Sequence, residues 1–288
     1  MEYVTFGKTG KRVSRLGYGG AVVGLKGYLA DYDPDRAADR EVVIKAIRAA
    51  YDLGVTYFDT APSYGDGRGE TIYGEALAGI DRQSIFVATK LTTHKEPGSA
   101  RKSLEQSLKR LGMDYVDLIQ FHGSSYTGEQ AAAVLKPGGY LDELAELKRQ
   151  GLARHIGFTT EDNNGPVFDF IADGRFDTMQ ICYNLFMQHS YDPNRPFGSI
   201  LEADRQGMGI ATMRATTSGM FMRWLKKVDP GNTRDYTRDL IQFVFSNPLV
   251  DVVLVGMRTE EEVRANVAIC EDTAGRIDIM KDMFTYYI

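Results

Sequence analysis

The chain has 288 residues, of which 43% are hydrophobic and 25% charged, and its formal net charge is −5 at pH 7. This length is long for an ordinary domain but normal for a single α/β barrel over residues 1–288. An acidic balance without a basic stripe argues against nucleic acid or an anionic membrane as partner.

Targeting and metal-binding signals, which are absent from the sequence, further narrow the class of protein. No apolar run approaches the length of a membrane span, and the N-terminus has no apolar leader, so we expect a cytoplasmic protein. Cys182 and Cys270 are too few for a disulfide framework, and no Cys/His spacing suits zinc or an iron–sulfur cluster. We therefore expect two free buried thiols and no metal.

Strand-like and helix-like segments alternate along the whole chain. Residues 3–6 and 12–15 flank a turn at Gly7 and predict a hairpin. Eight strand-like runs follow, at residues 15–20, 55–60, 84–90, 115–121, 153–158, 177–182, 208–213 and 251–255. Apolar residues at helical spacing separate them, as in residues 39–54, 99–112, 139–151, 237–247 and 260–270. This alternation predicts an α/β fold, a (β/α)8 TIM barrel, rather than an open sheet, whose glycine-rich fingerprint is absent.

Three long segments follow strands, so in a barrel they lie on the face that carries active sites. They are residues 21–38, 123–138 and 214–236. Their aromatic residues either contact substrate or pin the loops onto the barrel rim, and both readings stay open; these residues are Tyr28, Tyr32, Tyr126, Phe221 and Trp224. Tyr28 and Trp224 are the candidates for substrate binding.

Four polar residues, Asp59, Tyr64, Lys90 and His122, stand at or just past the ends of successive strand-like runs. A parallel barrel gathers these ends on one face. A free tyrosine has a pKa of roughly 10, and a nearby lysine ammonium lowers it. Asp59 can hold Lys90 in its charged form, and His122 can orient the reacting oxygen or relay a proton. Each residue alone also has a structural explanation, as a turn cap, a rim aromatic, a solvated strand end or a core histidine.

Together the four side chains suit protonation of a carbonyl oxygen while a hydride arrives at its carbon. None of them is a hydride source, so a nicotinamide cofactor is required. Two other function classes remain: a barrel that binds the cofactor as a regulatory or sensor module, and a lyase or isomerase that uses the same acid without net redox change.

The chain resembles the aldo-keto reductase family nearly end to end. The motifs are GVTYFDTAPSYG-x-x-x-GE, FVATK, SLEQSLKRLGMDYVDLIQFHG, LKRQGLARHIGFTT and VGMRTEEEVRAN, in the family's order. The resemblance implies a barrel whose bottom is closed by the N-terminal hairpin, and reduction of an aldehyde or ketone to an alcohol. It implies that Tyr64 is the general acid, that Lys90 and Asp59 tune it, and that His122 orients the substrate carbonyl. It also implies NADPH, bound in an extended form without a Rossmann domain.

The nicotinamide end departs from the family pattern at several positions. Thr159 and Thr160 replace the usual Ser-Asn pair, and Thr160 lacks the amide that asparagine offers; a turn or helix cap is the alternative role for both. Gln180 matches a third carboxamide ligand. Met213 stands where many members stack a tyrosine, and a thioether can pack against a ring. The remaining cofactor candidates include Gly20, Ala21 and Asp59. Arg214 either reaches a cofactor phosphate or forms a salt bridge at the rim, and Gly219 suits a loop whose backbone approaches the pyrophosphate closely.

The adenine end is expected at residues 256–266, beginning at Gly256. Thr259 and Glu262 predict a capping box, and the start of such a helix is an anion site. Arg258 suits a 2′-phosphate, and Asn266 resembles the family's adenine contact. Glu262 occupies a position where NADPH-selective members often have arginine, so it either caps the helix or binds ribose hydroxyls and admits NADH. We expect NADPH.

Overall fold

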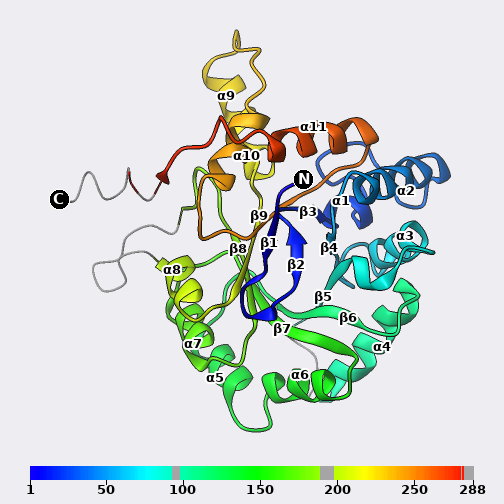
Figure 1. Ribbon diagram of the computed structural model, residues 1–288, viewed down its shortest axis with the longest axis vertical. Helices are drawn as coiled ribbons and strands as arrows, with labels where there is room; N and C mark the ends of the chain where they lie inside the picture. Colours follow the sequence, from blue (N-terminus) through cyan, green and yellow to red (C-terminus); the bar gives the residue numbers. More distant parts are fainter. Residues whose placement is uncertain (93–97, 189–197, 280, 282–288) are drawn as a thin grey trace.

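The computed structural model describes residues 1–92, 98–188, 198–279 and 281. Its centre is a closed barrel of eight parallel strands in the order β10-β3-β4-β5-β6-β7-β8-β9 (Figure 1). The strands are β3 (Leu16–Gly19), β4 (Tyr57–Asp59), β5 (Phe86–Thr92), β6 (Val116–His122), β7 (Ala153–Thr160), β8 (Thr178–Cys182), β9 (Gly209–Met213) and β10 (Val252–Val255). Each predicted strand corresponds to one of them, so the predicted (β/α)8 barrel is confirmed.

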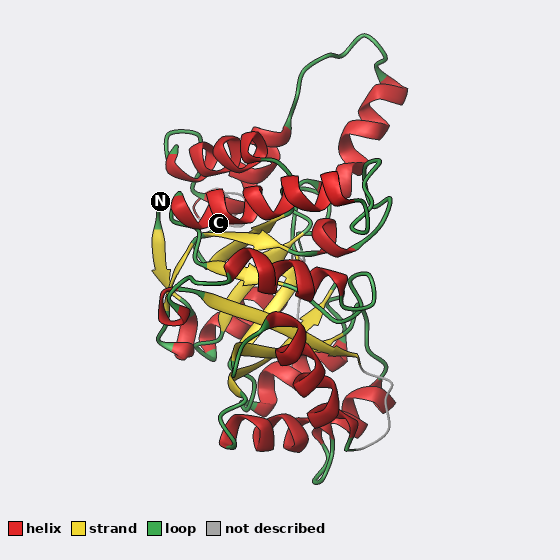
Figure 2. Cartoon of the chain, turned by 90° about the vertical axis from the view of Figure 1, so that its right-hand side faces the viewer, coloured by secondary structure: helices red, strands yellow, loops and turns green. Residues whose placement is uncertain are grey.

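Helices lie around the barrel and most of them cover the outer face of its strands, whereas the helix at Met220–Val228 projects away from it (Figure 1 and Figure 2). They are α1 (Ala21–Gly24), α2 (Ala37–Asp52), α3 (Arg68–Leu77), α4 (Ser99–Leu111), α5 (Gly128–Leu135), α6 (Tyr140–Arg149), α7 (Gly165–Asp173), α8 (Gly198–Arg205), α9 (Met220–Val228), α10 (Thr237–Phe245) and α11 (Glu260–Glu271). Three single turns of 3-10 helix complete the set: η1 (Gly7–Thr9), η2 (Arg82–Ser84) and η3 (Thr217–Gly219). None of the described helices is long and apolar enough to cross a bilayer.

Helix α4 illustrates how the sequence pattern becomes a packed element. Its buried residues include Ala100, Leu104, Leu108 and Leu111, which recur at intervals of three and four and so form one apolar stripe. Gly112 ends the helix with φ 63°, a left-handed conformation that glycine adopts without steric cost. The stripe therefore faces the protein interior, while the charged residues Arg101, Lys102, Glu105 and Lys109 are exposed.

An apolar plug closes the bottom of the barrel. Strands β1 (Tyr3–Thr5) and β2 (Arg12–Ser14) form the predicted antiparallel hairpin beside it. Phe6, fully buried between them, makes edge contacts with Tyr57 and Phe86, at ring-centroid distances of 5.4 and 5.6 Å. A side chain at Gly209 would lie 2.7 Å from the Phe6 ring, so only glycine fits there. Apolar side chains thus fill this end of the barrel, which leaves the opposite end for a pocket.

At that opposite end, two of the loop aromatics hold the loops in place. Tyr32 is buried and its hydroxyl donates to the carbonyl of Val23 at 2.7 Å. Tyr126 is also buried and donates to the carbonyl of Thr159 at 2.7 Å. Of the two roles predicted for Tyr32 and Tyr126, the structure therefore shows the one of pinning loops onto the barrel rim.

Candidate active site

A pocket of about 350 Å³ lies at the carboxyl ends of the barrel strands. All four residues predicted for the chemistry, Asp59, Tyr64, Lys90 and His122, line it. Eight other predicted site residues line it too: Gly20, Ala21, Tyr28, Thr159, Gln180, Met213, Arg214 and Gly256. Residues separated by more than two hundred positions are thus brought to one cavity by barrel closure.

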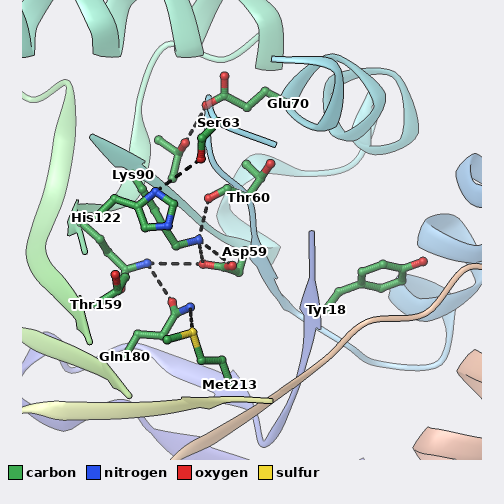
Figure 3. Close-up of polar contacts among 12 residues, drawn as sticks. Tyr18, Asp59, Thr60, Ser63, Glu70, Lys90, His122, Thr159, Gln180 and Met213 are labelled. Atoms are coloured by element: carbon green, nitrogen blue, oxygen red, sulfur yellow. Dashed lines mark hydrogen bonds and ion pairs between the residues drawn. The ribbon is translucent and has the colours of Figure 1, made fainter. Parts of the chain in front are cut away.

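Lys90 and Asp59 form a buried ion pair on neighbouring strands (Figure 3). The Lys90 ammonium donates to both Asp59 carboxylate oxygens at 2.7 Å and to the Thr60 carbonyl at 2.8 Å. Lys90 was expected to close its strand, but β5 continues to Thr92, so Lys90 extends into the barrel from inside the strand. Burial lowers the pKa of Lys90, but Asp59 and Tyr64 more than offset this and hold it above its usual value. The ammonium therefore stays charged at neutral pH.

Tyr64 lies in the turn that follows β4, with its ring 4.9 Å from the Lys90 ammonium. Hydrogen bonds at both ends of the turn hold it: the Tyr64 amide donates to the Ala61 carbonyl at 3.0 Å, and the Gly69 amide donates to the Tyr64 carbonyl at 3.1 Å. Burial raises the pKa of Tyr64, and the Lys90 ammonium opposes that shift without reversing it. Lys90 thus lowers the pKa of Tyr64 as expected, but desolvation of the phenol outweighs the nearby charge and the net shift is upward.

His122 ends β6 and completes the group. Its ring lies edge-on to the ring of Tyr64, with 6.0 Å between the centroids. Burial, followed by repulsion from the Lys90 ammonium, lowers the pKa of His122 to about 3, so the imidazole is neutral at physiological pH. The Ser63 hydroxyl lies 3.5 Å from Nδ1. When that hydroxyl donates to Nδ1, the ring proton sits on Nε2 and can be donated to another group.

The two threonines at the end of β7 are largely committed to local contacts. The Thr159 hydroxyl donates to the Gly123 carbonyl at 2.8 Å and accepts from the Gly123 amide at 3.0 Å. Thr160 is fully buried and outside the pocket, and its hydroxyl bonds to the Ser124 carbonyl and to the backbone of Asp162. Thr160 thus has the turn role that was the alternative reading, and the structure does not bring its side chain to the site.

Two glycines let the backbone of separate loops meet at the pocket wall. A side chain at Gly20 would lie 2.3 Å from the carbonyl oxygen of Asp59, and one at Gly256 would lie 2.6 Å from the Val22 side chain. Gly219 has φ +70° and lies outside the pocket lining. Arg214 lines the pocket and pairs with Glu161 at 2.7 Å, which is the rim salt bridge that the sequence left open.

At the start of α11 the capping box is confirmed. The Thr259 hydroxyl accepts from the Glu262 amide at 3.2 Å, and a Glu262 carboxylate oxygen accepts from the amides of Arg258 and Thr259. The Arg258 guanidinium donates to the carbonyls of Val22 and Tyr28. Arg258, expected at a 2′-phosphate, and Glu262, expected at the cap or at ribose hydroxyls, therefore already have protein partners, and neither lines the pocket.

Asn266 and Trp224 also lie outside the pocket lining. Asn266 is buried; its amide NH2 donates to the Glu262 carbonyl at 2.8 Å, while its side-chain oxygen has no hydrogen-bond partner in the described part of the chain. Trp224 is 52% exposed on α9 and contacts Phe186, with 5.6 Å between the rings. The structure thus does not bring Trp224 to the cavity where substrate contact was expected.

Two buried residues that sequence reasoning overlooked support the site. Glu70 accepts from the Thr89 hydroxyl at 2.6 Å and pairs with Arg110, which ties α3 to β5 and α4. Gln120 is fully buried beside Asp59. A signal was present for Gln120, because it lies two residues before His122 in a strand and so faces the same side.

Comparison with known proteins assigns the chain to a family. The model of the aldo/keto reductase family matches residues 15–242. L-galactose dehydrogenase of Arabidopsis thaliana is 27% identical over 93% of this chain and 88% of its own length. An NADH-specific methylglyoxal reductase of Escherichia coli is 29% identical over 64% of this chain and 60% of its own.

The fold also has solved counterparts. An aldo/keto reductase from Klebsiella pneumoniae, solved in complex with NADP and acetate, superposes with a TM-score of 0.73 at 22% identity, covering 93% of this chain and 89% of that one. The family model spans most of the barrel, and the pocket contains the four side chains that the motifs predicted. The chain therefore belongs to the aldo/keto reductase family.

Proposed function

We propose that this protein reduces an aldehyde or ketone to an alcohol, with NADPH as the reductant and Tyr64 as the proton donor. One observation carries the proposal: a phenol, a buried ammonium–carboxylate pair and a neutral imidazole converge in one pocket. Neither a structural role nor cofactor binding alone requires a buried lysine against a tyrosine ring. The same arrangement suits protonation of a carbonyl oxygen by a positioned side chain.

Each side chain has a distinct part in this chemistry. The raised pKa keeps Tyr64 protonated at neutral pH, so a proton is available to the substrate oxygen. Once the proton has left, the Lys90 ammonium stabilises the phenolate, and Asp59 holds that ammonium in place. His122 is neutral, so it acts by donating a hydrogen bond that orients the carbonyl rather than as a cationic acid.

The residues present fit a nicotinamide cofactor, which when bound supplies the hydride. Gly20 and Gly256 line the pocket without side chains, so a ligand there can approach the backbone closely. Gln180 and Thr159 stand on the pocket wall where a carboxamide would be held. The unpaired side-chain oxygen of buried Asn266 can accept from the adenine amino group.

NADPH is favoured over NADH by one charged group. Arg258 stands at the N-terminal end of α11, where its guanidinium and the helix dipole both suit a phosphate. It must exchange the carbonyls of Val22 and Tyr28 for that phosphate. Because a relative is named as NADH-specific, both cofactors belong in the test.

The test follows the absorbance of NADPH or NADH as it is consumed with a panel of aldehydes and ketones that includes methylglyoxal. In the oxidising direction, L-galactose is mixed with NADP+ or NAD+, and the absorbance of the reduced cofactor is followed as it forms. We expect turnover with at least one carbonyl compound. Tyr64→Phe should lower kcat by roughly 10²–10⁴-fold, the usual worth of a general acid, while calorimetry shows unchanged NADPH affinity. Tight cofactor binding with no turnover of any compound would overturn the reductase function, and a fully active Tyr64→Phe variant would overturn the role of Tyr64.

A further inference from the structure

Gln120 links the ion pair to the wall where a carboxamide would be held. It lies on β6, is fully buried, and has no part in the chemistry described above. Its side-chain nitrogen donates to Asp59 Oδ1 at 3.3 Å and to the side-chain oxygen of Gln180 at 3.0 Å. A single amide group thus connects Asp59, the partner of Lys90, with Gln180.

These contacts determine which end of each amide points where. An ionised carboxylate only accepts hydrogen bonds, so Gln120 must turn its NH2 group toward Asp59. The second N–H of the same group points to Gln180, which must then present its oxygen. The NH2 group of Gln180 is left on the other side, 3.7 Å from the sulfur of Met213 on the pocket wall (Figure 3).

The Gln180 side chain has only weak partners for its NH2 group: the Met213 sulfur, and the Asp59 carboxylate, whose pKa Gln180 lowers less than Lys90 and Gln120 do. A thioether sulfur is a weak acceptor, so its contact with Met213 is readily exchanged for a better one. The hydroxyls of Thr159 and Thr160, by contrast, already bond to backbone groups of residues 123, 124 and 162. Of these three side chains, Gln180 is therefore the one whose N–H group a ligand can use.

Only one end of the Gln120 amide is satisfied. Its side-chain oxygen is buried and has no hydrogen-bond partner in the described part of the chain. A buried acceptor without a partner destabilises the folded state. Leucine would avoid that penalty, but it would also remove the donor to Asp59 Oδ1 and to the side-chain oxygen of Gln180. What the amide provides is the pair of N–H groups that join Asp59 to Gln180.

We propose that Gln120 is a positioning residue that orients Gln180, so that Gln180 donates from Nε2 to the carboxamide oxygen of the nicotinamide. The inference rests on the proposed function for the identity of the ligand. It predicts the direction of the hydrogen bond: Gln180 donates to the oxygen of the carboxamide and does not accept from its NH2 group. This gives the chain a specific contact at the end of the cofactor where Thr160 is not available.

The test is calorimetric titration, which needs no turnover, of NADPH and of its 3-acetylpyridine analogue. The analogue keeps the carbonyl oxygen and replaces the NH2 group with methyl. Gln120→Leu and the volume-conserving Gln120→Met should each weaken both ligands about fivefold to tenfold, the worth of roughly one hydrogen bond. The matched control is Gln242→Leu, since Gln242 is also a buried glutamine with an unpaired oxygen, and its NH2 bonds only to backbone carbonyls of α11 and the turn behind it. It should leave both affinities unchanged.

Three outcomes would overturn the inference. Loss of NADPH affinity with unchanged affinity for the analogue would mean that Gln180 accepts from the NH2 group. Unchanged affinity for both ligands in folded Gln120→Leu and Gln120→Met would mean that Gln120 positions nothing. Wild-type protein that binds neither ligand would overturn this inference together with the proposed function, whereas the expected binding pattern without carbonyl turnover would overturn the reductase function alone.

Discussion

The proton-donor end and the adenine end of the proposed site are built in different ways. At the first, Lys90 and Asp59 are almost fully buried, lie on adjacent strands and bond to each other. At the second, Arg258 and Glu262 lie at the exposed start of a helix and bond to a loop and to a cap. Groups on barrel strands are positioned by the whole sheet, whereas groups at a helix start depend on local contacts that a ligand can exchange.

The largest effect should come from removing the charge at the buried end. Lys90→Met leaves the Asp59 carboxylate buried without its partner, so we expect a loss of about 3–5 kcal/mol in the free energy of unfolding, together with loss of reduction. Urea denaturation at pH 7 measures it. The control is Lys45→Met, which breaks an exposed pair with Glu41 and should cost within about 1 kcal/mol. If both variants lost the same free energy of unfolding, burial would not make the Lys90–Asp59 pair more important for stability than the exposed Lys45–Glu41 pair.

A second effect concerns pH. Because the pKa of His122 is lowered to about 3 in the folded protein, its imidazole stays neutral from pH 8 down to pH 5, and kcat/KM for reduction should show no inflection from this residue. In the unfolded chain the pKa is about 6.5. The unfolded state therefore binds the proton first, and stability should fall as pH drops from 6.5 toward 3.

His122→Asn should weaken this acid-side loss of stability, and thermal unfolding at pH 5 and pH 7.5 measures the difference between the two proteins. An NMR titration of wild-type protein that places the His122 pKa near 6.5 would contradict the prediction. Such a value would also allow the histidine to act as a cationic acid.

The smallest effect should come from the exposed end. Arg258→Ala should weaken NADPH binding by roughly tenfold, about the worth of one charge-assisted contact, and leave NADH binding unchanged. Calorimetry with both cofactors measures it, and Arg264→Ala, an exposed arginine on the same helix, is the control. Equal loss for both cofactors would show that Arg258 acts by holding the carbonyls of Val22 and Tyr28 rather than by contacting a phosphate.

Sequence reasoning succeeded where a pattern has one structural solution. Eight alternating strand and helix signals leave a closed barrel as the natural arrangement. The ends of β4 and β6 then carry Asp59 and His122 to one face, where Lys90 extends from within β5. The capping box was predicted from Thr259 and Glu262, which stand three residues apart in the sequence. Sequence reasoning failed where a role depends on how far a side chain lies from the pocket. Trp224, for example, contacts Phe186 and does not line the pocket.

The sequence by itself determined the barrel, its hairpin and the set of chemical groups at its mouth, because hydrophobic periodicity and strand ends are local properties of the chain. Only the tertiary structure decided the balance of energies among those groups. It showed that burial outweighs Lys90 at Tyr64 and that His122 stays neutral. It also revealed that Gln120 joins Asp59 to Gln180. Desolvation and the direction of an amide depend on every neighbour in space, and closure of the barrel supplies those neighbours.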